Sequence, residues 1–281
     1  MINNISRNKK NITKMPLNKR IVRIFVFIIF TIFALSYAYI VFWCFYTGGR
    51  DATEISRNAF GFTKFDISKY GEVFTLFEDE NGNNFFDMLG NSLYFSFLGP
   101  FLCIFVACQL AYVTSKYKFF GAGGVYFIVL VVITLPIYGT QTALYRLLYD
   151  IGFINSRLML LTSLNGFSIY YMYFYAFFKN LSWTYAEAAE IDGANEWGIF
   201  FKVMLPQSIG MFGSLFMMLW ISDWNSYQTA LIFLPKMPTL AVGIYNFKTT
   251  MEYSGGRNDL LYAACSLSIL PPLMLLPPDN F

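Results

Sequence analysis

Long apolar stretches separated by short polar ones run along almost the whole chain. A helix needs about 20 mostly apolar residues to cross the hydrocarbon core of a bilayer. Six stretches approach or exceed this length, at residues 21–46, 85–114, 121–139, 158–178, 207–233 and 260–276. The first is too long for the apolar part of a signal peptide, and no small-residue cleavage site follows it. The pattern therefore predicts an all-α membrane protein with six transmembrane helices.

The composition supports this class. Hydrophobic residues make up 56% of the chain and charged residues 13%, whereas soluble domains carry about 25% charged residues. Histidine is absent, so no imidazole is available for proton transfer or metal binding. The net charge of +3 is too small to indicate a nucleic-acid partner. The four cysteines lie in apolar stretches without a CxxC pair, and we expect them to be small buried hydrophobic residues.

Basic residues near the first span predict its orientation. Seven cations and no acid surround its start, namely Arg7, Lys9, Lys10, Lys14, Lys19, Arg20 and Arg23. Because cytoplasmic segments are rich in Lys and Arg, residues 1–20 are predicted to be a basic cytoplasmic tail. Residues 47–84 then form an extracytoplasmic loop that has room for short helices. Alternation places 140–157 and 234–259 outside and 179–206 inside.

The segment 184–206 departs from the apolar pattern. Four carboxylates lie within ten residues, at Glu187, Glu190, Asp192 and Glu196. Thr184 and Glu187 fit a capping box, although the helix could equally begin at Ser182. Gly193 follows an aspartate and suits a left-handed helix end. The segment therefore predicts a helix, a turn and a second helix.

The second helix is expected to start near Ala194. Its apolar positions have helical spacing and predict one stripe facing the bundle: Trp197, Phe200, Phe201, Met204 and Leu205. Pro206 marks the junction with the next span, since proline is tolerated in the first turn of a helix. An amphipathic loop resting on the lipid surface is one interpretation. Acidic residues are unusual on anionic lipid, which favours a protein partner.

The spacing within this segment resembles the EAA loop of ABC-importer permeases. Glu187, Ala188 and Ala189 are followed after three residues by Gly193, and then after eleven by Leu205 and Pro206. Only Val203, in place of isoleucine, departs from the family pattern. Further short motifs between residues 85 and 276 resemble the carbohydrate-uptake, maltose-permease branch: Asn91–Leu93, Ala111–Tyr112, Leu135–Pro136, Gly152–Asn155 and Trp224–Asn225.

The resemblance implies an ABC importer permease (MetI-like) fold in a bacterial cell membrane. It implies a second homologous permease, two cytoplasmic ATPase subunits and an extracytoplasmic sugar-binding receptor. The cytoplasmic helix–turn–helix at 182–206 would be the coupling loop, with these contact residues: Glu187, Ala188, Ala189, Asp192, Gly193, Leu205 and Pro206. The chain contains no GxxxxGK[ST] motif for ATP phosphates. We therefore expect no enzyme activity and no cofactor in this chain, with ATP bound by the partner ATPases.

A polar group near the end of the fifth span is a candidate substrate site. Asp223 is the only acid placed well inside a predicted span, and intramembrane carboxylates are candidate functional residues. Aromatic and hydrogen-bonding neighbours suit a sugar: Trp224, Asn225, Tyr227 and Gln228. A contact with the partner permease is the alternative, and the tryptophan also fits an interface anchor. Gln109 is a weaker pathway candidate, for which packing is favoured.

The domain plan follows from these assignments. Residues 21–46 form the first transmembrane helix, 85–276 a five-helix permease core, and 277–281 a short C-terminal end. Pro136 predicts a kink, and the prolines near the end predict a distorted or terminated last helix: Pro271, Pro272, Pro277 and Pro278. The segment 235–259 is either a contact for receptor and sugar or an ordinary connector. A permease for a non-sugar solute remains the alternative function, whereas a membrane enzyme or a scaffold is less favoured.

Overall fold

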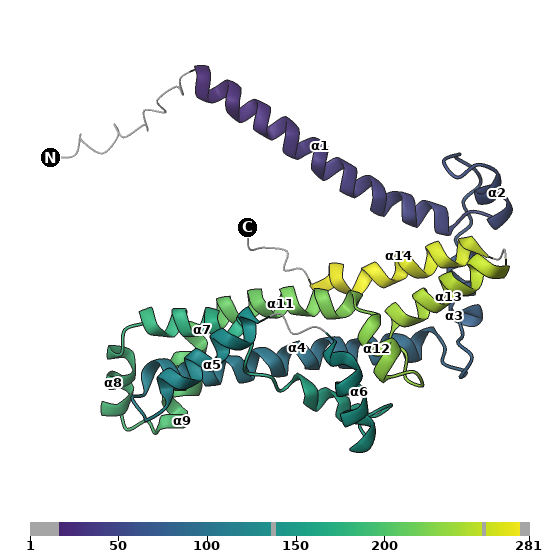
Figure 1. Cartoon of the computed structure of the whole chain (residues 1–281). Helices are drawn as coiled ribbons and strands as arrows, with labels where there is room; N and C mark the ends of the chain where they lie inside the picture. The colour runs from purple at the N-terminus through teal and green to yellow at the C-terminus, as the bar shows by residue number, and fades with distance from the viewer. Residues whose placement is uncertain (1–16, 136–138, 255–256, 276–281) are drawn as a thin grey trace.

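The computed structural model describes residues 17–135, 139–254 and 257–275. These residues are helical apart from connecting segments and one isolated bridge between Glu78 and Asn84, which confirms the all-α prediction (Figure 1). The first half contains α1 (Leu17–Gly48), α2 (Ala52–Arg57), α3 (Ser68–Leu76), α4 (Phe85–Lys116), α5 (Ala122–Thr134), α6 (Thr140–Asp150) and η1 (Arg157–Ser163). The second half contains α7 (Ile169–Asn180), α8 (Thr184–Ile191), α9 (Glu196–Ile199), η2 (Phe200–Met204), α10 (Leu205–Gln207), α11 (Ile209–Asn225), α12 (Gln228–Phe233), α13 (Leu240–Ser254) and α14 (Asn258–Leu275).

Helix α4 is the central rod of the bundle. A full capping box starts it: the Asn84 side chain accepts from the backbone N–H groups of Phe86 and Asp87, and the Asp87 carboxylate accepts from the Asn84 N–H. Its 32 residues span about 48 Å at 1.5 Å per residue. Helices α7 and α11 pack along it. One helix therefore runs from α3 and α13 to α8 and α9, and we call the α8–α9 side the loop end (Figure 1).

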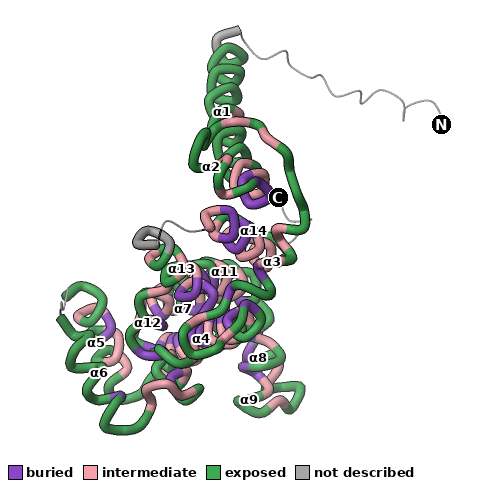
Figure 2. The backbone as a smooth tube through the Cα atoms, turned by 90° about the vertical axis from the view of Figure 1, so that its right-hand side faces the viewer, coloured by how far each residue is buried: buried purple, intermediate pink, exposed green. Residues whose placement is uncertain are grey.

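The packing is dense along this rod, whereas α1 is packed only at its C-terminal end, against α14. Tyr171, Phe174 and Phe178 of α7 are completely buried against α4. By contrast, no residue in the most apolar 18-residue window of α1 is buried, and the tube of α1 is almost entirely exposed until it reaches α14 (Figure 2). So large an exposed apolar surface requires an apolar environment or a partner.

The predicted spans are less regular than the hydropathy pattern indicates. Among the described residues, two helices are long and apolar enough to cross a membrane, Lys19–Gly48 and Phe85–Lys116. A third is obtained if Glu196–Gln207 and Ile209–Asn225, which meet at 71°, count as one span. The apolar stretch 121–139 is helical over Ala122–Thr134, and Pro136 lies outside the described residues.

Two predicted spans are not single helices. The stretch 158–178 consists of the 3₁₀ helix η1, a non-helical segment and then α7. Turn-forming residues lie at this break, where the Asn165 side chain accepts from the Phe167 N–H. The stretch 207–233 is interrupted between α11 and α12. Apolarity alone did not reveal either break, because an apolar window does not detect local turn chemistry.

The polar connections and the last span also differ from expectation. The short helices expected in 47–84 are present as α2 and α3. The segments 140–157 and 235–259 contain α6 and α13 rather than irregular loops. Helix α14 continues through Pro271 and Pro272 to Leu275, so these prolines do not end it. Pro277 and Pro278 lie outside the described residues.

Candidate functional site

The helix–turn–helix at the loop end is present, but its start differs from the prediction. Helix α8 begins after Trp183, which makes no side-chain cap, so the capping box of Thr184 and Glu187 is wrong. The N–H of Glu187 instead binds the Trp183 carbonyl at 3.1 Å, while the N–H of Thr184 donates to Ser182 Oγ at 3.3 Å. Because Trp183 already has helical backbone angles, its carbonyl accepts the hydrogen bond from the Glu187 N–H that the capping side chain was expected to accept.

The turn after α8 is formed as the sequence predicts. Gly193 has φ +82°, a left-handed conformation that favours glycine. The N–H of Ala194 donates to the Ala189 carbonyl at 2.9 Å, and the Gly193 N–H donates to the backbone carbonyl of Glu190 at 2.9 Å. These bonds satisfy the last carbonyls of α8. The turn thus holds the two helices in one defined geometry.

The second helix of the loop contains an irregularity that the sequence did not reveal. Asn195 caps α9 by accepting from the Gly198 N–H at 2.8 Å, and η2 then continues as a π-helix. Of the predicted stripe, Phe200 and Met204 are buried, whereas Trp197 and Phe201 are 69% and 43% exposed. A π turn inserts an extra residue and rotates the following side chains. The predicted single apolar face is therefore only partly correct.

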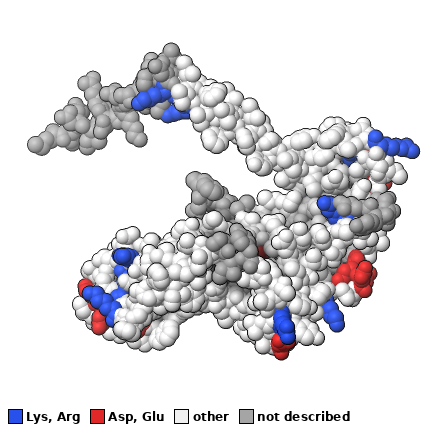
Figure 3. Space-filling view, in the orientation of Figure 1, with Lys and Arg blue, Asp and Glu red and all other residues white. Residues whose placement is uncertain are grey.

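The predicted coupling residues divide into a tip and a base. Glu187, Ala188, Asp192 and Gly193 are exposed at the tip, while Ala189 is half-buried. Leu205 and Pro206 lie at the base, where the chain bends into α11. Among the residues that the structure describes, the carboxylates of Glu187, Glu190 and Asp192 make no ion pair or side-chain hydrogen bond. Basic and acidic side chains lie side by side at this end (Figure 3).

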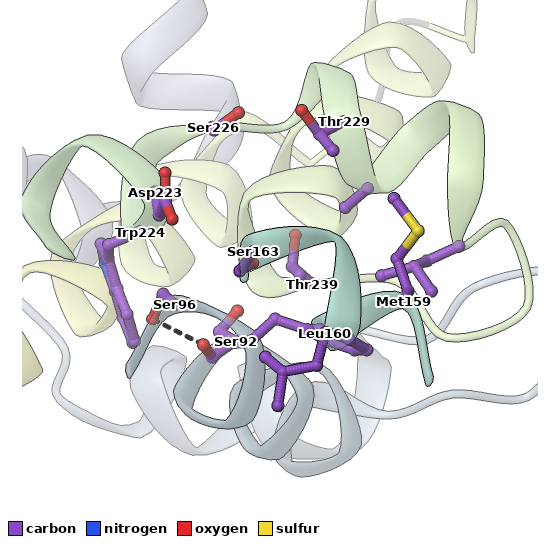
Figure 4. Close-up of a pocket in the computed structure, with 13 residues that line it drawn as sticks. Ser92, Ser96, Met159, Leu160, Ser163, Asp223, Trp224, Ser226, Thr229 and Thr239 are labelled. Atoms are coloured by element: carbon purple, nitrogen blue, oxygen red, sulfur yellow. Dashed lines mark hydrogen bonds between the residues drawn. The ribbon is translucent and has the colours of Figure 1, made fainter. Parts of the chain in front are cut away.

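Asp223 lies in the last turns of α11 beside a polar cavity of about 130 Å³. Figure 4 shows hydroxyl side chains from separate segments of the chain around it: Ser92, Ser96, Ser163, Ser226, Thr229 and Thr239. Ser92 Oγ accepts from the Leu240 N–H at 2.6 Å, whereas the buried hydroxyl of Thr239 has no partner among the described residues. These hydroxyls were missed by the sequence analysis because single serines and threonines in apolar stretches carry no motif.

Gly99 of α4 keeps this cavity open. A Cβ atom at this position would lie 3.2 Å from Ser163 Oγ and 3.8 Å from Asp223 Oδ2. The first distance is tighter than an ordinary van der Waals contact, so a larger residue would push the η1 hydroxyl aside. The Asp223 carboxylate and the Ser163 hydroxyl therefore both lie close to the α4 backbone at Gly99.

Trp224 separates this cavity from a second one of about 290 Å³. The indole N–H donates to the Ser268 carbonyl at 3.2 Å, which fixes the ring between the two spaces. Asn225 and Tyr227 line the second cavity, where Tyr227 stacks on Tyr245 with ring centroids 4.5 Å apart. Asp223, Asn225 and Tyr227 thus line the two cavities on either side of the Trp224 ring.

The two remaining candidates lie apart from this group. Gln228 starts α12 and lines neither cavity. Gln109 is ten residues beyond Gly99 on α4, about 15 Å along the helix. It lines an apolar groove with Glu196 and Trp197 at the loop end. The structure therefore does not bring Gln109 near Asp223.

Comparisons with known proteins identify this arrangement, although no family model matches the chain. The chain is 24% identical over 232 residues to the arabinooligosaccharides transport system permease protein AraQ of Halalkalibacterium halodurans, covering 80% of each chain. It is 27% identical over 171 residues to the polygalacturonan/rhamnogalacturonan transport system permease protein YtcP of Bacillus subtilis, covering 60% of this chain and 58% of that one.

A solved structure shares the whole architecture. A chain in the crystal structure of a bacterial ABC transporter involved in the import of the acidic polysaccharide alginate superposes with a TM-score of 0.72 at 22% identity. The match covers 93% of this chain and 96% of that one. The chain has the fold of an ABC importer permease. The resemblance inferred from the EAA spacing is confirmed, since the sequence relatives are permeases of sugar-uptake systems.

A network of ion pairs joins the helices at the end of the bundle opposite the loop end. Asp259, which is completely buried at the start of α14, binds Arg257 at 2.8 Å and Lys69 at 3.6 Å. Arg257 also contacts Glu72, and Lys69 contacts Asp51 at 3.2 Å. Hydrogen bonds to Asp259 and Glu72 raise the pKa of Arg257. We call this region, formed by α2, α3 and the start of α14, the ion-pair end.

Proposed function

We propose that the chain is one permease subunit of an ATP-driven importer for carbohydrates, which forms half of the translocation pathway with a second, homologous permease. The observation that carries the proposal is the tip of α8, where exposed carboxylates without internal partners are presented on a helix anchored to the bundle. The permease relatives support the same assignment. A permease without a phosphate-binding motif obtains its energy from separate ATPase subunits.

In this proposal the tip docks on an ATPase and the base passes the movement to the spans. Ala186 of α8 is buried with Ile199, Phe200 and Met204 in the core formed by α4 and α7. The tip is thus a rigid extension of the bundle rather than a free loop. Closure of two ATPase subunits would then rock the bundle between inward-open and outward-open states.

The proposed orientation places the loop end in the cytoplasm. Helix α1 begins on the same side of the molecule as α8 and α9, while α2 and α3 lie on the other side (Figure 1). Lys19, Arg20 and Arg23 in the first turns of α1 are thus on the side of the proposed coupling loop, as the positive-inside rule requires. The receptor would then meet the ion-pair end, and α1, α4, α5, α7, α11 and α14 would be the six spans.

The two cavities beside Trp224 are the proposed sugar contacts. Hydroxyls and one carboxylate can exchange hydrogen bonds with a sugar, and the aromatic rings offer apolar faces. At about 30 Å³ for each water molecule, the Asp223 cavity of about 130 Å³ has room for the hydroxyl edge of one sugar unit. A longer oligosaccharide would extend into the pathway between the two permeases.

The test is sugar uptake by the complete transporter, with co-purification of its subunits. We expect an ATPase and a second permease to co-purify with the wild-type chain, and labelled oligosaccharides to enter vesicles only with ATP. Glu187→Ala and Gly193→Asp should each abolish uptake, whereas Glu80→Ala, an exposed carboxylate at the opposite end, should not. Unchanged uptake and co-purification in the two loop variants would overturn the coupling assignment.

The same uptake assay tests where the substrate binds and to which chemical class it belongs. Asp223→Asn should raise the KM for the transported sugar while the ATPase still co-purifies. A panel of neutral oligosaccharides, acidic oligosaccharides and non-sugar solutes identifies the class. Uptake of only a non-sugar solute would replace the carbohydrate assignment and leave the importer assignment intact.

A further inference from the structure

The C-terminal end of α4 is joined to the coupling loop by a hydrogen bond between two side chains. The Tyr117 hydroxyl, one residue beyond α4, donates to the Glu196 carboxylate at the start of α9. The same hydroxyl lies 3.1 Å from that of Tyr112. Burial, and then the Glu196 carboxylate and Tyr112, raise the pKa of Tyr117. The phenol therefore keeps its proton and remains a donor at neutral pH.

The neighbouring residue holds the other side of the same loop. Lys116 donates to the Leu181 carbonyl, where the chain leaves α7, and its ammonium group lies 5.9 Å from the Trp183 ring. Tyr117 meets Trp183 edge to face at 5.8 Å. The last residue of α4 and the residue that follows it thus bind both the entry to α8 and the start of α9, on either side of the exposed tip.

The opposite end of α4 reaches the proposed sugar contacts. Ser92, Ser96 and Gly99 of this helix border the Asp223 cavity, and the helix is continuous from there to Lys116. Pro100 lies inside α4 and removes one of its backbone hydrogen bonds, but the helix continues to Lys116. A displacement of the loop that is passed to Tyr117 would therefore be carried along a single helix. The covalent route, through η2 and α10, instead crosses the 71° bend before α11.

We propose that Tyr117 and Glu196 form the joint through which the coupling loop moves α4, and that they are positioning residues for transport rather than ordinary packing. The proposal rests on the proposed function. In this arrangement the ATPase moves the tip, the Tyr117–Glu196 bond and the Lys116 contact keep α4 attached to it, and α4 reshapes the cavity beside Asp223. Loss of the bond leaves the ATPase docked but separates its cycle from substrate movement.

The experiment measures ATP hydrolysed per sugar imported, using the complete transporter in proteoliposomes. Tyr117→Phe removes the donor and keeps the ring contacts. We expect this ratio to rise about tenfold, the factor for one lost hydrogen bond to a charged group, with unchanged co-purification of the ATPase. Tyr126→Phe is the matched control, since Tyr126 is a half-buried tyrosine of α5 whose ring contacts Tyr175. It should keep the wild-type ratio.

Variants at the acceptor complete the test. Glu196→Gln still accepts a hydrogen bond and should stay within about twofold of wild type, whereas Glu196→Ala should match Tyr117→Phe. The double variant Tyr117→Phe/Glu196→Ala should be no worse than either single one, because both remove the same bond. If Tyr117→Phe weakens assembly of the transporter, the ratio of ATP hydrolysed to sugar imported is compared between Glu196→Gln and Glu196→Ala instead. A higher ratio in the alanine variant supports the joint.

Failure of the proposed joint and failure of the proposed function give different results. A wild-type ratio in Tyr117→Phe, or equal ratios for Gln and Ala at position 196, would overturn the joint while the importer assignment stands. A wild-type chain that neither retains an ATPase nor imports any member of the panel would overturn the proposed function itself.

Discussion

The loop end and the ion-pair end contain the same kinds of charged side chain but use them differently. At the ion-pair end Asp259 is completely buried and bound by Arg257 and Lys69. At the loop end the carboxylates of Glu187 and Asp192 are exposed and make no ion pair among the described residues. A buried charge needs its internal partner, whereas an exposed one remains available to another protein. Internal pairing therefore distinguishes carboxylates that hold the fold from those that are free to bind a partner.

The largest effect on stability is expected from Asp259→Ala. This change removes the buried carboxylate shared by Arg257 and Lys69. Since both cations keep other carboxylate partners, we expect the loss of hydrogen bonds to a charged group, about 1.5–3 kcal/mol. The free energy of unfolding in detergent, followed by denaturant titration, is the measurement. Glu190→Ala at the loop end is the control and should stay within about 0.5 kcal/mol of wild type. A similar loss for both variants would remove the difference between the two ends.

A smaller effect is expected from Gly193→Ala at the turn of the proposed coupling loop. The left-handed φ of +82° costs an L-amino acid about 1–2 kcal/mol, and Gly193→Asn should cost less because asparagine tolerates this conformation better. Thermal unfolding compares the two variants, and sugar uptake shows whether the turn geometry is needed. An alanine variant as stable as wild type would mean that the turn relaxes without strain.

The ion-pair end should also weaken at alkaline pH. A hydrogen bond to Asp51, followed by attraction to Glu72 and Asp259, raises the pKa of Lys69 against the opposing effect of burial. A raised pKa in the folded state contributes stability that is complete below the unfolded value of about 10.4 and is lost as the pH rises through the folded value. The unfolding temperature between pH 8 and pH 11.5 should fall less steeply in Lys69→Met than in wild type. Parallel curves would show that Lys69 does not contribute.

The smallest effect on stability is expected from Glu187→Ala, although uptake should be lost. The side chain is exposed and makes no ion pair or side-chain hydrogen bond among the described residues, so the free energy of unfolding should change by no more than about 0.5 kcal/mol. Paired measurements of unfolding and of sugar uptake separate these effects. A large loss of stability would show that Glu187 holds the fold, as the carboxylate of Asp259 does.

Features that depend on neighbouring residues were predictable from the sequence. The α8 helix and the left-handed Gly193 were both expected, because each is set by a few adjacent residues. Pro206 was expected at the junction with the next span, but the 71° bend found there was not. The expected capping box failed because the Trp183 carbonyl took that role. The buried face of the second helix was only partly predicted, because the π turn of η2 changes which side chains point inward.

Features that join distant segments were not predictable. The hydroxyls around Asp223 come from α4, η1, α12 and the connections on either side of α12, and no spacing rule links serines in segments so far apart in the sequence. The Tyr117–Glu196 bond and the ion pairs Lys69–Asp259 and Arg257–Glu72 are likewise contacts between segments far apart in the sequence. Sequence analysis could name Asp223 as unusual, but not the groups that surround it.

By itself, the sequence determined a helical membrane-type chain with an acidic, glycine-terminated surface helix, because helix periodicity, apolarity and turn chemistry are local properties. Only the tertiary structure decided which carboxylates have partners and that Lys116 and Tyr117 tie α4 to both sides of the proposed coupling loop. These features depend on the packing of helices far apart in the chain. The geometry of that packing follows from the shapes of many side chains at once.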